Sequence, residues 1–170
     1  SYLTGLLRDG SIDLMLGRLP GAREVAGLTF EHLYDEEVVL VSRAGHPLAG
    51  DTRSALARCP LILPPEGAII RGAVDDYLVS LGLGSIRPAM ETVALPLARG
   101  VLMGSDALWF ISRGVVAEDL DRGDLVLVPT DARYLAGAVG ITRRQGGASS
   151  AAQDLMMQLA REGAQAGLYR

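Results

Sequence analysis

Short apolar runs alternate with helical patterns along this chain of 170 residues, and this order constrains the fold more than any single motif. Runs typical of strands cover residues 12–16, 28–34, 38–41, 61–63, 86–90, 107–111, 125–128 and 138–142. Apolar residues at helical spacing predict a helix that ends near residue 10, and further helices within 51–59, 68–81, 93–103 and 115–120. A chain in which strands alternate with helices predicts an α/β fold.

Several helix ends can also be predicted. Asp51 is expected to cap one helix, and Ser149 or Ser150 the final helix, because their side-chain oxygens can accept a hydrogen bond from the first turn. Pro96 fits only the first turn of a helix, so the helix within 93–103 is expected to begin after Thr92. Five residues of the final helix are expected to share one face: Ala152, Leu155, Met156, Leu159 and Gly163.

Composition excludes several classes of protein. The chain is 49% hydrophobic and 21% charged, which is typical of a soluble globular protein, and its length allows one domain or two small lobes. Its net charge is −4 with scattered acidic residues, so no basic face is available to hold DNA. Cys59 is the only cysteine, which excludes an internal disulfide and favours a reducing compartment. No signal peptide or apolar run of about 18 residues is present, so we expect a cytoplasmic protein without membrane contact.

Residues that would indicate catalysis are scarce. The two histidines, His32 and His46, lack the spacing of metal ligands, and no nucleophile elbow, P-loop or dinucleotide-binding motif is present. The paired carboxylates at 75–76 and 118–119 lie on predicted amphipathic helices, where a solvated helix face is the simpler interpretation. We therefore expect neither an enzyme nor a metal or cofactor site.

Candidate binding residues follow the strands. In an open α/β sheet a ligand lies beyond the carboxyl ends of the strands, where helix N-termini present free N–H groups. Residues 17–18, 66–71, 91–93 and 112–114 occupy such places, and three of these segments carry an arginine: Arg18, Arg71 and Arg113. Each arginine alone could be an ordinary surface residue. Together they favour a small acidic ligand, because the planar guanidinium matches a carboxylate.

Several of these segments resemble a known family. Residues 10–16, 33–47 and 139–144 resemble the effector-binding region of LysR-type transcriptional regulators. Within that family, residues 63–67 with Arg71 and residues 105–116 are similar to the group of regulators of protocatechuate catabolism and of galactose-binding proteins. The resemblance covers nearly the whole chain.

The resemblance implies a fold and an assembly. It implies two Rossmann-like lobes joined by crossing strands, a periplasmic-binding-protein-like fold of type II. Residues 1–43 with 135–170 would form regulatory lobe I, without its first strand, helix and strand, and residues 44–134 would form regulatory lobe II. The family architecture further implies an effector cleft between the lobes and a homodimer or homotetramer. DNA would be bound only through an N-terminal winged helix-turn-helix that this sequence does not contain.

The resemblance also implies roles for individual residues. The expected ligand-binding residues are Arg18, Gly67, Ile70, Arg71, Thr92, Phe110 and Ser112. Arg71 would pair with a carboxylate, Thr92 and Ser112 would donate hydrogen bonds, and Phe110 would pack on an apolar part of the effector. The alternative for Phe110 and its neighbour Trp109 is the hydrophobic core, and strand alternation does not decide between them.

Two further functions share such a fold. A periplasmic solute-binding protein of a transporter has the same two-lobe design and would require an export signal upstream. An enzyme would require a catalytic or cofactor-binding residue, and for every candidate here a structural role is the simpler interpretation.

Overall fold

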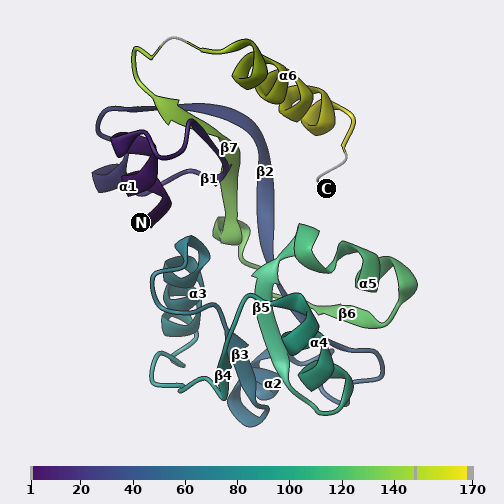
Figure 1. Ribbon diagram of the computed structural model, residues 1–170. Coiled ribbons are helices and arrows are strands. Elements are labelled where there is room, and N and C mark those ends of the chain that lie inside the picture. Colours follow the sequence, from purple (N-terminus) through teal and green to yellow (C-terminus); the bar gives the residue numbers. More distant parts are fainter. Residues whose placement is uncertain (1, 148, 168–170) are drawn as a thin grey trace. The chain divides into compact units, whose positions relative to one another are not determined.

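The computed structural model of the chain describes residues 2–147 and 149–167, without the side chain of Arg133. The chain divides into two compact units (Figure 1). Unit 1 contains Ser1–Glu36 and Gly137–Arg170, and unit 2 contains Glu37–Ala136. The chain therefore passes between the units twice, once after Glu36 and once before Gly137.

The described strands form a seven-stranded sheet with the order β1-β7-β2-β5-β3-β4, in which β6 also pairs with β2. The strands are β1 (Leu14–Arg18), β2 (Leu28–Arg43), β3 (Leu61–Leu63), β4 (Met90–Glu91), β5 (Leu108–Ser112), β6 (Leu125–Val128) and β7 (Ala136–Arg144). The α-helices are α1 (Tyr2–Asp9), α2 (Thr52–Arg58), α3 (Ile69–Ser80), α4 (Leu95–Met103), α5 (Ala117–Arg122) and α6 (Ala151–Gln165). Three 3-10 turns complete the fold: η1 (Ala22–Glu24), η2 (Arg113–Val116) and η3 (Arg133–Leu135). No helix of the described residues is long and apolar enough to cross a membrane.

Two strand predictions differ from the structure. The runs at 28–34 and 38–41 belong to one continuous strand, β2, because the acidic residues between them also adopt the extended conformation. The predicted strand at 86–90 shortens to Met90–Glu91. Pro88 lies inside that run and cannot donate a ladder hydrogen bond, so pairing with β3 begins only at Met90.

The predicted helix starts are confirmed. Asp51 accepts a hydrogen bond from the backbone N–H of Ser54 at the start of α2. Ser150 and Gln153 form a reciprocal capping box at the start of α6. Pro96 lies in the first turn of α4, where its missing N–H leaves no helical hydrogen bond unmade. The predicted helix at 115–120 is divided between η2 and α5.

The shared face predicted for α6 is largely not the face that packs in the core. Met157 and Ala160 pack on Ile141 in the core of unit 1, whereas four of the five expected residues are exposed and only Gly163 is buried. The exposed residues are Ala152, Leu155, Met156 and Leu159. The helix carries two apolar stripes, and helical spacing alone cannot show which of them meets the sheet. Three of the four buried residues of α6, Ala160, Gly163 and Ala164, have small side chains, which allow a helix to lie close to a strand.

The core of unit 2 surrounds a parallel group of strands. β3 pairs in parallel with β4 and with β5, and β2 pairs antiparallel with β5 and β6. The largest side chains of this core, Trp109 and Phe110, are adjacent residues of β5, and both are completely buried. A strand that is covered on both faces reads as a continuous apolar run, as residues 107–111 do.

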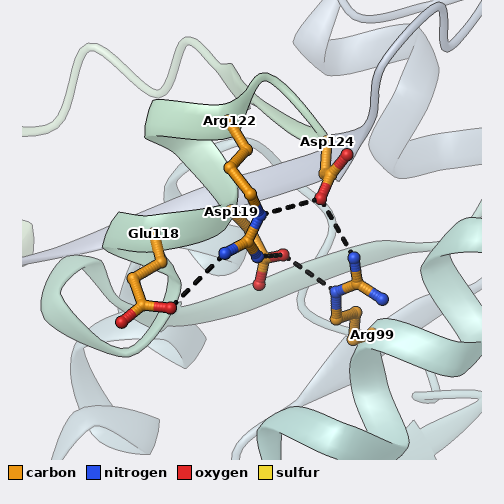
Figure 2. Close-up of polar contacts among 5 residues, drawn as sticks. All are labelled: Arg99, Glu118, Asp119, Arg122 and Asp124. Atoms are coloured by element: carbon orange, nitrogen blue, oxygen red, sulfur yellow. Dashed lines mark hydrogen bonds and ion pairs between the residues drawn. The ribbon is translucent and has the colours of Figure 1, made fainter.

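An ionic network joins α4, α5 and the start of β6 in unit 2 (Figure 2). Asp119 accepts hydrogen bonds from Arg99 Nε at 2.8 Å and from Arg122 Nη2 at 2.5 Å. Asp124 also contacts both arginines, and Glu118 contacts Arg122. The Asp119 side chain is only 3% exposed, so the expectation of a solvated helix face for this residue is wrong. The sequence does not show the arginine that reaches it from another helix.

We expect Asp119 to make the stability of unit 2 depend on pH. Burial raises the pKa of Asp119, but the hydrogen bonds from Arg99 and Arg122 outweigh this effect and hold the pKa below its ordinary value. The ionised Asp119 therefore contributes its full stabilisation of unit 2 above the unfolded-state pKa of about 4. This stabilisation is lost as the pH falls through the lower pKa of the folded state. Urea denaturation between pH 7 and pH 3 should show Asp119→Asn to be less stable by about 1–3 kcal/mol at pH 7, with the difference shrinking toward pH 3. Glu118→Gln is the control, because that carboxylate is 91% exposed, and equal pH dependence in both variants would contradict the assignment.

Candidate functional site

The candidate site lies where three parallel strands of unit 2 end. Because β3, β4 and β5 run in the same direction, their carboxyl ends meet at one edge of the sheet. We call this region, residues 64–71, 91–94 and 112–116, the carboxyl edge. The Thr92 N–H donates to the Leu63 carbonyl at 2.9 Å, which joins the end of β4 to the end of β3.

The helices that begin at the carboxyl edge have no side-chain caps. Ala68, Ala94 and Ser112 are the residues that precede α3, α4 and η2, and none of the three caps its helix through a side-chain hydrogen bond. α2 and α6, which begin elsewhere, are capped by aspartate and serine. The Arg71 N–H already donates to the Ala68 carbonyl at 2.9 Å, so among the described residues the N–H groups of Ile69 and Ile70 are the ones at the start of α3 that an outside acceptor could use.

Arg71 lies in the first turn of α3, as expected, and its guanidinium already has acceptors. Nε donates to Asp75 at 2.8 Å, and Nη1 donates to Glu91 at 2.6 Å and to the Pro64 carbonyl at 2.8 Å. The Arg71 side chain is 13% exposed. Burial lowers the pKa of Arg71, but the hydrogen bonds to Glu91 and Asp75 outweigh it and raise the pKa overall. Arg71 is thus a fixed cation between two carboxylates.

Two other predicted residues shape the backbone of the carboxyl edge. Gly67 has a φ of +86°, in the left-handed region that favours glycine, and the turn it completes is closed by a hydrogen bond from Ala68 N–H to the Pro65 carbonyl. The Thr92 hydroxyl oxygen accepts from the Ala94 N–H at 3.0 Å. Thr92 is buried, and Ser112 is half-buried at the start of η2.

Phe110 and Ile70 lie in the core beneath the carboxyl edge. The Phe110 ring is fully buried and meets the Tyr77 ring edge-on, with centroids 5.9 Å apart. Ile70 belongs to the same core cluster. Trp109 is also buried, and its indole N–H donates to the Thr92 carbonyl at 3.2 Å. In this structure the core interpretation therefore holds for both aromatic residues, and Phe110 presents no face to a ligand.

Arg18, the remaining predicted residue, belongs to unit 1. Its Nη2 donates to the backbone carbonyl of Glu36 at 3.2 Å and to the Glu36 carboxylate at 3.3 Å. Burial lowers the pKa of Arg18, and the nearby Glu36 charge partly offsets that effect. A Cβ at Gly137 would lie 2.5 Å from Arg18 Nη1, so the guanidinium lies directly against that glycine. The ligand-binding role of Arg18 stays a prediction.

Sequence reasoning did not foresee that two acidic residues pair with Arg71. Asp75 follows Arg71 by four positions on a helix, which is the spacing of an ion pair and could have identified it. Glu91 ends β4 and lies 20 residues from Arg71 in the sequence, so only the three-dimensional pairing of β3 with β4 brings the two together.

The structure also contains a pocket that the predicted residues do not line. It has a volume of about 500 Å³ and lies in unit 2, between residues 37–40 of β2 and residues 127–136.

Within the described residues, no group of three or more histidine, cysteine, aspartate or glutamate side chains could hold a metal ion. Burial raises the pKa of Cys59, and nearby Asp106 raises it further, so this residue is a thiol at neutral pH.

Comparison with known proteins identifies the family. Residues 1–165 match the model of the LysR substrate binding domain. The HTH-type transcriptional regulator PcaQ of Agrobacterium fabrum is 39% identical over 161 residues, which cover 93% of this chain and 52% of PcaQ. The uncharacterized HTH-type transcriptional regulator YdcI of Escherichia coli is 30% identical over 158 residues, covering 92% of this chain and 52% of YdcI. The chain spans about half the length of these relatives.

Solved structures agree on the fold. The regulatory domain of Synechocystis PCC6803 CcmR, solved in complex with 2-PG, superposes with a TM-score of 0.80 at 17% identity, covering 96% of this chain and 79% of that domain. The predicted α/β fold, periplasmic-binding-protein-like and of type II, is confirmed, as is the predicted resemblance to the protocatechuate regulators. Because the family model covers nearly the whole sequence, this chain belongs to the substrate-binding domains of LysR-type transcriptional regulators.

Proposed function

We propose that this domain senses a small acidic effector at the carboxyl edge of unit 2. Arg71 supplies a fixed cation there, and α3 begins beside it with an N-terminus that no side chain caps. A carboxylate bound at this place would accept hydrogen bonds from both. The juxtaposition of Arg71 with the start of α3 is the observation that supports this function most directly.

The expected site keeps the six predicted residues that belong to unit 2, with different contributions. Gly67, Arg71, Thr92 and Ser112 would meet the effector, while Ile70 and Phe110 would form the apolar layer that holds them in place. The similarity to PcaQ supports an effector from aromatic catabolism, such as an aromatic acid or a ring-cleavage dicarboxylate.

Regulation would follow from a shift between conformations. The effector must bind one arrangement of the domain more tightly than another, because a ligand with equal affinity for both shifts nothing. In the full-length regulator, a winged helix-turn-helix outside this sequence would bind DNA, consistent with the net charge of −4 here. We further propose that the protein acts in the cytoplasm as a homodimer or homotetramer.

Calorimetric titration of the domain with protocatechuate, carboxymuconate, ketoadipate and a neutral sugar tests this function. We expect one of the acids to bind and Arg71→Ala to weaken that binding about 10- to 100-fold, the range expected for loss of a hydrogen bond to a charged group. Arg53→Ala is the matched control, because Arg53 is an exposed arginine of unit 2 that lies on α2, outside the carboxyl edge. Binding of the neutral sugar alone, or equal affinity in Arg71→Ala and wild type, would refute the acidic-effector site.

A further inference from the structure

We propose that Glu91 occupies the place that an effector carboxylate takes on Arg71, so that effector binding exchanges one carboxylate for the other. This inference rests on the proposed function. It assigns Glu91 a role in setting the affinity and selectivity of the site, as a competitor that the domain carries within its own chain.

The three acceptors on Arg71 differ in how easily each can be replaced. The Pro64 carbonyl is part of the backbone that leads from β3 into α3, and Asp75 is held one helical turn away on α3 itself. Both carboxylates are partly exposed, Asp75 by 49% and Glu91 by 38%, but Glu91 reaches Arg71 from a separate strand, whereas Asp75 pairs with it at the i,i+4 spacing of one helix. Releasing the Glu91 side chain therefore disrupts neither the loop nor the helix.

The backbone around Glu91 is anchored independently of its side chain. Glu91 pairs with Leu63 in the β3–β4 ladder, and the next residue, Thr92, is held through both its N–H and its carbonyl. The carboxylate can thus swing away from Arg71 by side-chain rotation alone, while the strand end stays in place.

Electrostatics favours exchange over simple addition. Arg71 carries one positive charge and already faces the carboxylates of Asp75 and Glu91. A third carboxylate bound beside both would leave a net charge of −2 around one guanidinium, and like charges at such distances repel. If Glu91 leaves as the effector arrives, the local charge does not change.

The tethered carboxylate also sets a threshold for ligands. A group held on the same chain competes at an effective concentration of about millimolar or more. A simple monocarboxylate such as acetate makes with Arg71 only the carboxylate contact that Glu91 already makes. An effector displaces Glu91 only if it makes further contacts, such as hydrogen bonds to the first N–H groups of α3.

The test compares substitutions of Glu91 by calorimetric titration, with protocatechuate, carboxymuconate, ketoadipate and acetate as probes. Glu91→Gln keeps the size of the side chain but removes its charge, and we expect the acid that binds wild type to bind about 10-fold tighter. Glu91→Asp keeps the charge but shortens the side chain by one methylene, which removes the direct 2.6 Å hydrogen bond to Arg71. It should also tighten binding, whereas relief of general repulsion would leave Glu91→Asp unchanged.

Two controls separate competition from other effects. Asp76→Asn removes an exposed carboxylate of α3 that lies outside the carboxyl edge, and it should change affinity less than twofold, in contrast to Glu91→Gln. In an Arg71→Ala background, Glu91→Gln should give no gain, because the contact that it relieves is already absent. Melting curves of each variant establish that the domain is folded at the temperature of the titration.

The outcomes distinguish this inference from the proposed function. Suppose that an acid binds wild type, does not bind Arg71→Ala, and binds Glu91→Gln no more tightly than wild type. Glu91 then does not compete with the effector, so this inference is wrong although the proposed site is correct. Weaker binding to Glu91→Gln would likewise overturn it, because Glu91 would then contact the effector. If neither wild type nor Glu91→Gln binds any acid, the proposed function itself fails.

Discussion

Replacing Gly140 with alanine is expected to destabilise unit 1 by about 3 kcal/mol or more, the upper range for overpacking a closely packed site. A Cβ at this position would lie 2.0 Å from the Glu31 carbonyl oxygen and 2.7 Å from the Phe30 ring. The first of these contacts is to backbone, which cannot rotate away as the end of a flexible side chain can. Gly140 lies in β7, between β1 and β2, so neither neighbour can move without breaking a strand pair.

Gly17→Ala is the matched control for Gly140→Ala. Gly17 lies directly opposite Gly140 in the β1–β7 pair, and a Cβ added there meets no atom within 4 Å. Both substitutions make the same chemical change in neighbouring strands, so urea denaturation followed by circular dichroism should separate packing from strand propensity. We expect the Gly17 variant to remain within about 1 kcal/mol of wild type. Equal losses in the two variants would show that close approach at Gly140 is not the cause.

The parts of the fold that could be predicted from the sequence are those that depend on neighbouring residues. The apolar runs of β3, β5 and β6 and the caps at Asp51 and Ser150 are local signals, and each lies where it was expected. The face of α6 could not be predicted, because its two apolar stripes are equivalent until the sheet is placed against one of them. The same limit applies to Asp119, whose burial depends on Arg99 from another helix.

The candidate site, like the fold, could be predicted only where it depends on neighbouring residues. The places of Arg71 and Thr92 follow from the rule that ligands lie beyond strand ends, and the structure puts both residues at the carboxyl edge. Whether Arg71 is free cannot be read from its own segment, since Glu91 approaches it through the parallel pairing of β3 with β4. A long-range ion pair of this kind changes the expected chemistry from simple carboxylate binding to carboxylate exchange.

Phe110→Ala is expected to lower the stability of unit 2 by about 3–5 kcal/mol, the usual cost of removing a large buried aromatic side chain. The Phe110 ring is fully buried against Tyr77, and the cavity left behind would be bounded by core residues that cannot collapse into it. The sequence could not decide between core and ligand contact for this residue, because alternation along β5 assumes one buried face. Both faces of β5 are buried, as the complete burial of adjacent Trp109 shows.

The two roles of Phe110 predict opposite results in a pair of measurements on Phe110→Leu. This variant keeps part of the buried volume, so we expect it to be destabilised by less than Phe110→Ala yet to remain folded at 25 °C. If Phe110 acts only from the core, folded Phe110→Leu should bind the acid with an affinity within about twofold of wild type. A ring that packs on the effector would instead contribute about 0.5–1.5 kcal/mol of specific aromatic contact, and affinity would fall several-fold. That second result would mean that effector binding opens the core at Tyr77 and exposes the ring.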